Sequence, residues 1–444
     1  MQALLSYEQS PPLAAPFRFF LTAPCCGVLA GLLLIVYGED ALVMRWTPAA
    51  LALTHAVTAG FMLQAMLGAL IQILPVVVGV NLAAPGALAR RVHALSILGL
   101  AALTLAFLSF EPWAFRLAAA LFALALGDFL RAVARAFAGA RGVGATFAGL
   151  RLAAFGLAIT GALGVLLAAG LGELVALPLV ELTDTHAVWG FVVWGGALLA
   201  AVAYVVVPMF QLTPAYPARF ERHYVAAALL AVALWTALDY AGRAWVEPGS
   251  PFEVLPTLAL AGVAACGAGF AAVSLAVMRR SQRATLDATQ ILWRAAMASA
   301  FAAVAVWGAA QCVPGFAEWP AWPVLFAVLL LGGGFVSVIA GMLYKIVPFL
   351  VWLHLQNAGQ GRRMAPNMRK IVPEAAMQRQ MRLHLASVVL LAAAVFWPEA
   401  LARPAGVLIV LAQGALFLVL RTALAVCREH EAKLAALPPE QEAR

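Results

Sequence analysis

Charged residues are scarce in this chain of 444 residues. Only 11% of its residues are Asp, Glu, Lys or Arg, whereas 64% are hydrophobic. A soluble domain contains about 25% charged residues, so the composition excludes an ordinary soluble protein. Apolar runs of about 20 residues recur along the chain, and each is long enough to cross the hydrocarbon core of a bilayer. The sequence therefore predicts an all-α, polytopic membrane bundle whose main partner is the lipid bilayer.

The patterns of several other protein classes are also missing. The alternation of apolar and polar residues that builds an outer-membrane β-barrel is absent. The five cysteines show no C-x-x-C spacing, which gives no support to a zinc site or a redox dithiol. The first apolar run is not followed by the small-residue cleavage site of a signal peptide. Arginines lie in the segments between apolar runs, so we expect no nucleic-acid partner.

Twelve apolar runs fit membrane spans, and three of them are longer than the rest. These three are the second, sixth and tenth spans, and each contains a Gly-Phe step followed by a proline (Pro75, Pro208 or Pro348). The prolines lie 133 and 140 positions apart (208 − 75 and 348 − 208). We therefore predict one transmembrane domain of three pseudo-repeats, at about 18–134, 149–278 and 288–426. The predicted spans are 18–37, 49–80, 92–110, 112–134, 149–170, 183–210, 223–244, 255–278, 288–312, 320–350, 382–400 and 402–426.

The distribution of Lys and Arg predicts the orientation of the spans. With the N-terminus inside, only four of the 28 basic residues fall in outer loops: Arg45, Arg116, Arg243 and Arg403. Because cytoplasmic loops carry the excess of Lys and Arg, we predict a multi-pass protein of a bacterial-type inner membrane with both termini in the cytoplasm. The inner segments include a basic loop at 355–381, which we interpret as a topology determinant beside anionic headgroups. They also include a tail at 429–444, where we expect a short helix that frays into disorder.

Histidine is rare as well, yet two of the seven histidines occur in one repeated stretch. Thr54-His55-Ala56-Val57 opens the second span, and Thr185-His186-Ala187-Val188 opens the sixth, 131 positions later (185 − 54). The third long span lacks the histidine. A neutral imidazole nitrogen can ligate a metal ion or haem iron, and ionisable groups inside the membrane are costly and tend to be functional. Two interpretations stay open: His55 and His186 are cofactor or metal ligands, or they are interfacial histidines held by backbone carbonyls.

Other polar residues in the spans have simpler interpretations. Thr54 and Thr185 either orient the neighbouring histidines or cap the helix starts. Asp128 and Arg131 are predicted to form an ion pair, because they are three residues apart on one helix. Lys345 is expected to extend its ammonium group to the inner headgroups. The remaining histidines fall at inner ends or in loops, where we expect none to meet the outer pair: His93, His223, His354, His384 and His430.

The helix plan and the two histidine-bearing spans together resemble a known family. Twelve spans in three groups of four, with a histidine near the outer end of the second and sixth, resemble the haem–copper oxidase subunit I superfamily. The closest likeness covers residues 185–220, which begin THAVWGF, and the run LTHAVTAGF at 53–61 is similar to the haem-ligating second helix of that family. The resemblance implies that His55 matches a haem ligand and that His186 matches a copper ligand.

The sequence departs from this family at the other ligand positions. The family has a histidine pair in its seventh helix and histidines in the outer half of its tenth. Here the seventh span contains only His223, at its inner end, and residues 320–340 contain no histidine. A complete binuclear centre is therefore not expected, and neither is terminal oxidase activity. The helix plan is also similar to that of NnrS-like membrane proteins, which are associated with haem, copper and nitrosative stress.

Three functions follow from these observations. The first is a haem- or metal-binding inner-membrane protein in which His55 and His186 hold haem b or copper. It would act with respiratory partner subunits in electron transfer, the nitric oxide response or oxidase assembly. The second is a secondary transporter or permease, favoured by the internal repeats and the proline-containing long helices. The third is a scaffold that keeps the oxidase fold without its cofactors.

Overall fold

The computed structural model describes residues 10–140, 142–247, 249–359 and 364–436, and every regular element in these ranges is a helix. Twelve of the helical segments are long and apolar enough to cross a membrane. The prediction of an all-α polytopic bundle is therefore confirmed.

Several spans consist of consecutive helical segments of different type. The first four spans comprise α1 (Ala14–Tyr37) with the 3₁₀ turn η2 (Gly38–Ala41), α2 (Pro48–His55) with the π-helix η3 (Ala56–Met62) and α3 (Leu63–Val78), α4 (Pro85–Ser109) and α5 (Pro112–Ala138). The next four comprise α6 (Ala145–Leu171), α7 (Leu179–Val188) with the π-helix η4 (Trp189–Gly196) and α8 (Ala197–Gln211), α9 (Ala218–Trp245), and η5 (Pro251–Val254) with α10 (Leu255–Arg279). The last four comprise α11 (Ala288–Cys312), α13 (Trp322–Ala327) with the π-helix η6 (Val328–Val336) and α14 (Ser337–Gly359), α16 (Glu374–Phe396) and α17 (Pro398–Ala435), with the short helices α12 (Pro314–Ala317) and α15 (Met368–Ile371) between them.

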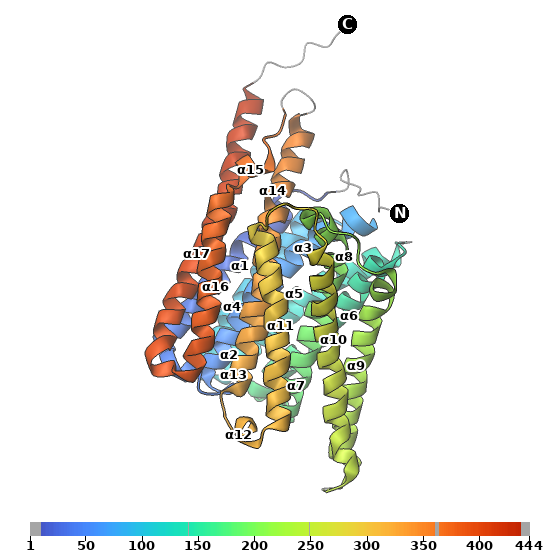
Figure 1. Ribbon diagram of the computed structural model, residues 1–444, viewed down its shortest axis with the longest axis vertical. Coiled ribbons are helices and arrows are strands. Elements are labelled where there is room, and N and C mark those ends of the chain that lie inside the picture. Colours follow the sequence, from blue (N-terminus) through green and yellow to red (C-terminus); the bar gives the residue numbers. More distant parts are fainter. Residues whose placement is uncertain (1–9, 141, 248, 360–363, 437–444) are drawn as a thin grey trace.

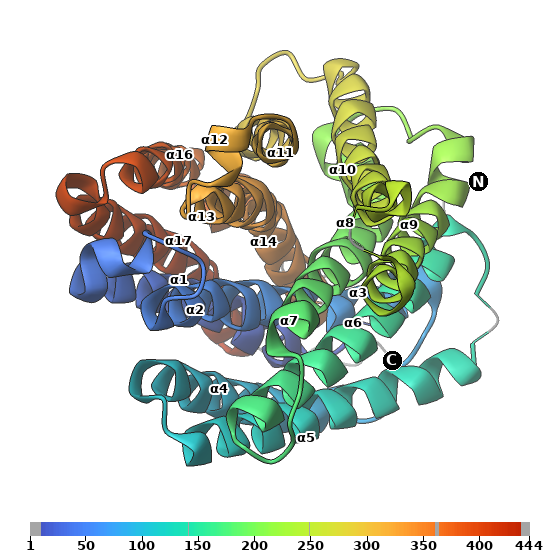
Figure 2. The same cartoon turned by 90° about the horizontal axis from the view of Figure 1, so that it is seen from below.

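The three long spans form the centre of the bundle. In the second, sixth and tenth spans, 78%, 61% and 61% of the most apolar window is buried, against 56% or less in every other span. Figure 2 shows the bundle from one end, with α7 and α14 near its middle and α4, α5, α9 and α16 around the outside. The spans that carry the repeated pattern are therefore those that meet inside the protein.

Each central span contains a π-helix at a comparable place. The three π-helices end at Met62, Gly196 and Val336, which are 134 and 140 positions apart (196 − 62 and 336 − 196). These spacings match those of the prolines inside α3, α8 and α14. A π-helical turn adds a residue to an α-helix and frequently marks a functional site. The backbone therefore gives the three central spans a common register.

The first and last spans pack closely and complete the bundle. A Cβ atom added at Gly31 of α1 would lie 2.8 Å from the carbonyl oxygen of Gly406 in α17, and the reverse distance is also 2.8 Å. Small residues let helices in a membrane approach this closely. As twelve crossings require, α1 begins and α17 ends at the same end of the bundle, here named the terminal end (Figure 1). The opposite end is named the far end. That the terminal end faces the cytoplasm stays a prediction.

Several helices extend beyond the predicted spans. α16 begins at Glu374 instead of 382, α14 continues past 350 to Gly359, and α17 continues past 426 to Ala435. Both ends of the predicted loop at 355–381 are therefore helical, and so is the start of the predicted tail at 429–444. The predicted spans are too short because hydropathy falls at the first arginine, whereas the helix itself continues as long as its charged side chains reach water. Arg362 and Arg363 of the basic loop, and the tail from 437, lie outside the described residues.

Candidate cofactor site

His55 and His186 both lie in the far half of the bundle, at the start of two central spans. His55 is seven residues from the end of η3 and His186 is ten residues from the end of η4 (62 − 55 and 196 − 186). His186 is therefore about one helical turn farther from the end of its π-helix than His55. The repeated Thr-His-Ala-Val stretch is thus offset by one turn from the backbone repeat.

The imidazole of His55 is held by its own helix and by α4. Its Nδ1 atom lies 2.8 Å from the carbonyl oxygen of Leu51. Because a carbonyl oxygen only accepts hydrogen bonds, Nδ1 is the donor and the lone pair lies on Nε2. The Phe107 ring packs against the imidazole with 4.9 Å between the ring centroids. These contacts fix both the tautomer and the orientation of the ring.

The imidazole of His186 is held by a neighbouring span. Its Nδ1 atom donates to the carbonyl oxygen of Thr160 in α6 over 3.0 Å, so its lone pair also lies on Nε2. Gly164, one turn along α6, makes room for the ring, because a Cβ atom there would lie 3.0 Å from Cε1 of His186. Both histidines that the sequence singled out thus lie in the far half of the bundle, each with its Nδ1–H on a backbone carbonyl.

Ion pairs at the far end brace the segment before His186. Arg45, in the loop that follows η2, donates to Asp184 over 2.6 Å, and its guanidinium stacks 4.3 Å above the ring of Trp46. Arg243 of α9 pairs with Asp239 at 3.0 Å and with Glu181 of α7 at 3.5 Å. Exposed pairs of this kind stabilise a fold by about 1 kcal/mol or less. Their main consequence is that α7 is tied to the loop after the first span and to the seventh span.

Neither predicted role of Thr54 and Thr185 is correct. Among the described residues, neither side chain hydrogen-bonds to a histidine. The hydroxyl of Thr185 donates to the carbonyl of Glu181, and the hydroxyl group that caps α2 belongs to Thr47. Capping requires a residue just before the first turn, whereas Thr54 and Thr185 lie near the ends of α2 and α7.

Sequence reasoning missed a third histidine in the far half of the bundle. His384 was assigned to the inner end of its span, but α16 begins ten residues earlier and the side chain is only 2% exposed. Its Nε2 atom lies 2.8 Å from the hydroxyl of Ser337, which donates to the carbonyl of Gly332 in η6 over 3.2 Å. The hydroxyl therefore accepts from Nε2–H, and Nδ1 has no partner in hydrogen-bonding geometry. The polar residues Gln380, His384 and Ser387, which share one face of an apolar helix, were the available signal.

A cavity of about 120 Å³ lies beside His384, between the first, second, tenth, eleventh and twelfth spans. Its walls are mainly apolar, and its polar lining residues are Arg45, Thr54, His384, Ser387 and Gln413. The side-chain oxygen of Gln413 is buried without a hydrogen-bond partner. His55 and His186 do not line this cavity. A second cavity of about 70 Å³ has apolar walls and lies at the centre, between α3, α8 and α14.

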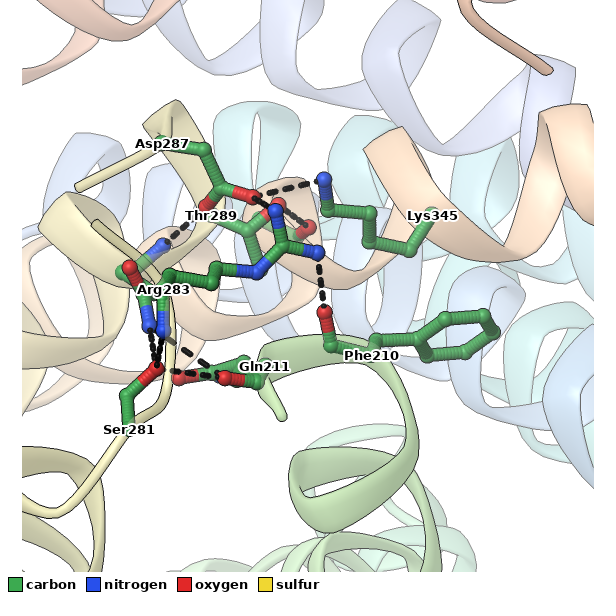
Figure 3. Close-up of polar contacts among 9 residues, drawn as sticks. Phe210, Gln211, Ser281, Arg283, Asp287, Thr289 and Lys345 are labelled. Atoms are coloured by element: carbon green, nitrogen blue, oxygen red, sulfur yellow. Dashed lines mark hydrogen bonds and ion pairs between the residues drawn. The ribbon is translucent and has the colours of Figure 1, made fainter. Parts of the chain in front are cut away.

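A charged network occupies the terminal end, where Lys345 was expected to reach the headgroups. Lys345 of α14 instead donates to Asp287 over 2.7 Å, and Arg283 approaches the same carboxylate at 3.3 Å (Figure 3). Asp287 also caps α11, and Arg283 donates to the carbonyl oxygen of Phe210 at the end of α8. The network therefore joins the end of the sixth span and the start of the ninth span to α14 of the tenth. The ion pair predicted between Asp128 and Arg131 is confirmed at 2.7 Å.

No protein-family model matches this chain, and no curated protein matches it significantly. The resemblance to the haem–copper oxidase superfamily is therefore one of sequence motifs and helix plan alone.

Proposed function

We propose that this chain is a haem- or copper-binding membrane protein whose cofactor ligands are His55 and His186. The observation that carries the proposal is the shared geometry of the two imidazoles. Each donates Nδ1–H to a backbone carbonyl, so each has its lone pair on Nε2, and both rings lie in the far half of the bundle. Metal-ligating histidines almost always hold their second ring nitrogen in this way, because the bond fixes the tautomer and the ring orientation.

The chemistry of the two side chains suits a two-imidazole ligand set. Among the described residues, His55 and His186 are not joined by a third His, Cys, Asp or Glu at ligand distance. A closed zinc site needs four such ligands, whereas haem iron and copper accept neutral imidazoles in smaller number. When bound, either group supplies one-electron redox chemistry inside the bilayer. The carbonyls of Leu51 and Thr160 would hold both imidazoles in one tautomer and one orientation for it.

A distant relation to haem–copper oxidase subunit I accounts for the twelve spans, the three central helices and the two histidines. The proposed roles are respiratory electron transfer, the nitric oxide response or oxidase assembly in a bacterial inner membrane, with respiratory partner subunits. The resemblance to NnrS-like proteins supports the same chemistry. Terminal oxidase activity is not proposed, because the seventh span contributes only His223 and residues 320–340 contribute no histidine.

The visible spectrum of the full-length protein tests this proposal. The protein is expressed with added haem precursor and copper, purified in detergent on a histidine-free tag, and assayed for absorbance and metal content. We expect a Soret band or bound copper, with a large loss in both His55→Ala and His186→Ala. His223→Ala is the matched control, because His223 is exposed on α9. A protein without haem or copper, or with a cofactor that both variants retain, contradicts the proposal.

A second candidate function, solute permeation, is favoured by the far-half cavity. Its walls hold two buried polar atoms without partners, Nδ1 of His384 and the side-chain oxygen of Gln413. Such atoms are costly to bury unless a bound molecule or water satisfies them. Solute flux into proteoliposomes without a redox partner, lost in a His384→Leu variant, would favour this function over the cofactor proposal.

A further inference from the structure

A second group of metal-ligating side chains lies at the terminal end, away from His55 and His186. There α14 and α17 extend beyond the rest of the bundle (Figure 1). His354 belongs to α14, whereas Cys427 and Glu431 are four residues apart on α17 and share one face of that helix. One ligand atom from each, the imidazole nitrogen, Sγ and a carboxylate oxygen, lies within 4.8 Å of the other two. Within the described ranges this is the one group of three such ligands.

The three side chains form a site with a buried floor and an open mouth. The thiol of Cys427 is 3% exposed, whereas the side chains of His354 and Glu431 are 38% and 45% exposed. Nε2 of His354 donates to Glu431 over 2.7 Å. The thiol of Cys427 interacts with the same carboxylate, so all three side chains converge on one point. An ion could enter from water and meet the sulfur last.

The distances are compatible with a transition-metal ion. Tetrahedral zinc binds sulfur at about 2.3 Å, nitrogen at about 2.0 Å and oxygen at about 2.1 Å, which places the ligand atoms roughly 3.5 Å apart. On metal binding, the two most widely separated ligand atoms would have to approach each other by about 1.3 Å at most. The distance between Nε2 of His354 and the carboxylate oxygen of Glu431 would increase by about 0.8 Å. Changes of this size require side-chain rotation and leave both helices in place.

We propose that His354, Cys427 and Glu431 bind zinc or another borderline-soft divalent transition metal. Thiolate and imidazole select such ions over calcium and magnesium, which prefer oxygen ligands. On binding, the thiol releases its proton to water and the His354 proton moves from Nε2 to Nδ1, so that both atoms present a lone pair. Three protein ligands leave a fourth position for water, as in exchangeable zinc sites. The ion joins α14, which continues the third central span, to α17.

Cobalt and zinc titrations of the full-length protein test this site. The protein is purified in detergent on a histidine-free tag, stripped with a chelator, and titrated with cobalt by absorption and with zinc by calorimetry. We expect a thiolate-to-cobalt charge-transfer band that saturates at one equivalent. Cys427→Ser should abolish the band, and His354→Gln and Glu431→Gln should weaken zinc binding at least about tenfold. Cys312→Ser and His223→Gln, both exposed, are the matched controls.

This proposal is independent of the cofactor at His55 and His186. The thiolate band should persist in a His55→Ala/His186→Ala variant, which separates failure at one site from failure at the other. Absence of the band, or unchanged zinc affinity in all three ligand variants, overturns the proposal. If Cys427→Ser does not elute as a folded protein, the surface variant Glu431→Gln decides, and unchanged zinc affinity in that variant overturns the proposal.

Discussion

Asp287 is the carboxylate that pairs with both cations of the charged network at the terminal end (Figure 3). Its carboxylate accepts from Lys345 at 2.7 Å and from the backbone N–H of Gln290 at 2.9 Å, and Arg283 lies 3.3 Å away. The side chains of Asp287, Lys345 and Arg283 are 11%, 18% and 27% exposed. Asp287→Ala would leave two largely buried cations facing each other without a counter-charge, and it would also remove the cap of α11.

The expected magnitudes follow from these contacts. Breaking a buried ion pair by removing one partner costs about 3–5 kcal/mol, and we take the low end because some exposure remains. Loss of the N-cap adds about 1 kcal/mol, so Asp287→Ala should lower the free energy of unfolding by about 4 kcal/mol. Lys345→Met leaves Asp287 capped and paired with Arg283, and its cost should be about 1 kcal/mol or less.

Unfolding in mixed detergent and denaturant, followed by tryptophan fluorescence, measures these differences. Asp287→Asn is the control that keeps a capping side chain and removes the charge. The double variant Asp287→Ala/Lys345→Met should be more stable than Asp287→Ala alone, because one uncompensated cation is gone. The reasoning is refuted if Lys345→Met destabilises the protein as much as Asp287→Ala, or if the two effects simply add.

Two further predictions concern close contacts of glycine. Gly164→Ala should push the His186 ring by a few tenths of an ångström and weaken cofactor binding about tenfold, measured by retained haem or copper. Gly127→Ala on α5 is the control, because a Cβ atom there has open space around it and should have no effect on cofactor binding. Gly406→Ala should force α17 away from the backbone of α1 and destabilise the protein by about 1–3 kcal/mol in the same unfolding assay. Gly414→Ala, where a Cβ atom meets nothing within 4 Å, should be neutral or slightly stabilising, and equal effects at 406 and 414 would contradict the packing argument.

The fold class and the central spans were predictable because a bilayer imposes a simple requirement on composition and length. Every span must be an apolar helix, so hydropathy alone located all twelve. The ends of the spans were less predictable. Arg379 and Arg382 moved the predicted start of the eleventh span to 382, although a helix can continue through residues whose charges reach water. That error placed His384 at a surface when it is buried beside η6.

Contacts between distant parts of the chain could not be predicted from one sequence. The carbonyl that holds His186 belongs to Thr160 in another span, and the partner of Lys345 lies 58 residues away at Asp287. The π-helices were also missed, because an extra residue in one turn leaves the hydropathy pattern unchanged. The motif therefore identified the two histidines. Their tautomers, and the one-turn offset of the motif from the π-helix repeat, could be seen only in the structure.

The cofactor content of four proteins tests the central claim most directly. Haem and copper per chain are measured in the unchanged protein, in His55→Ala, in His186→Ala and in the double variant, all purified identically. If both imidazoles ligate one centre, each single variant should lose most of the cofactor and the double variant should lose little more. Full retention in either single variant, or two partial losses that add in the double variant, would contradict a shared site.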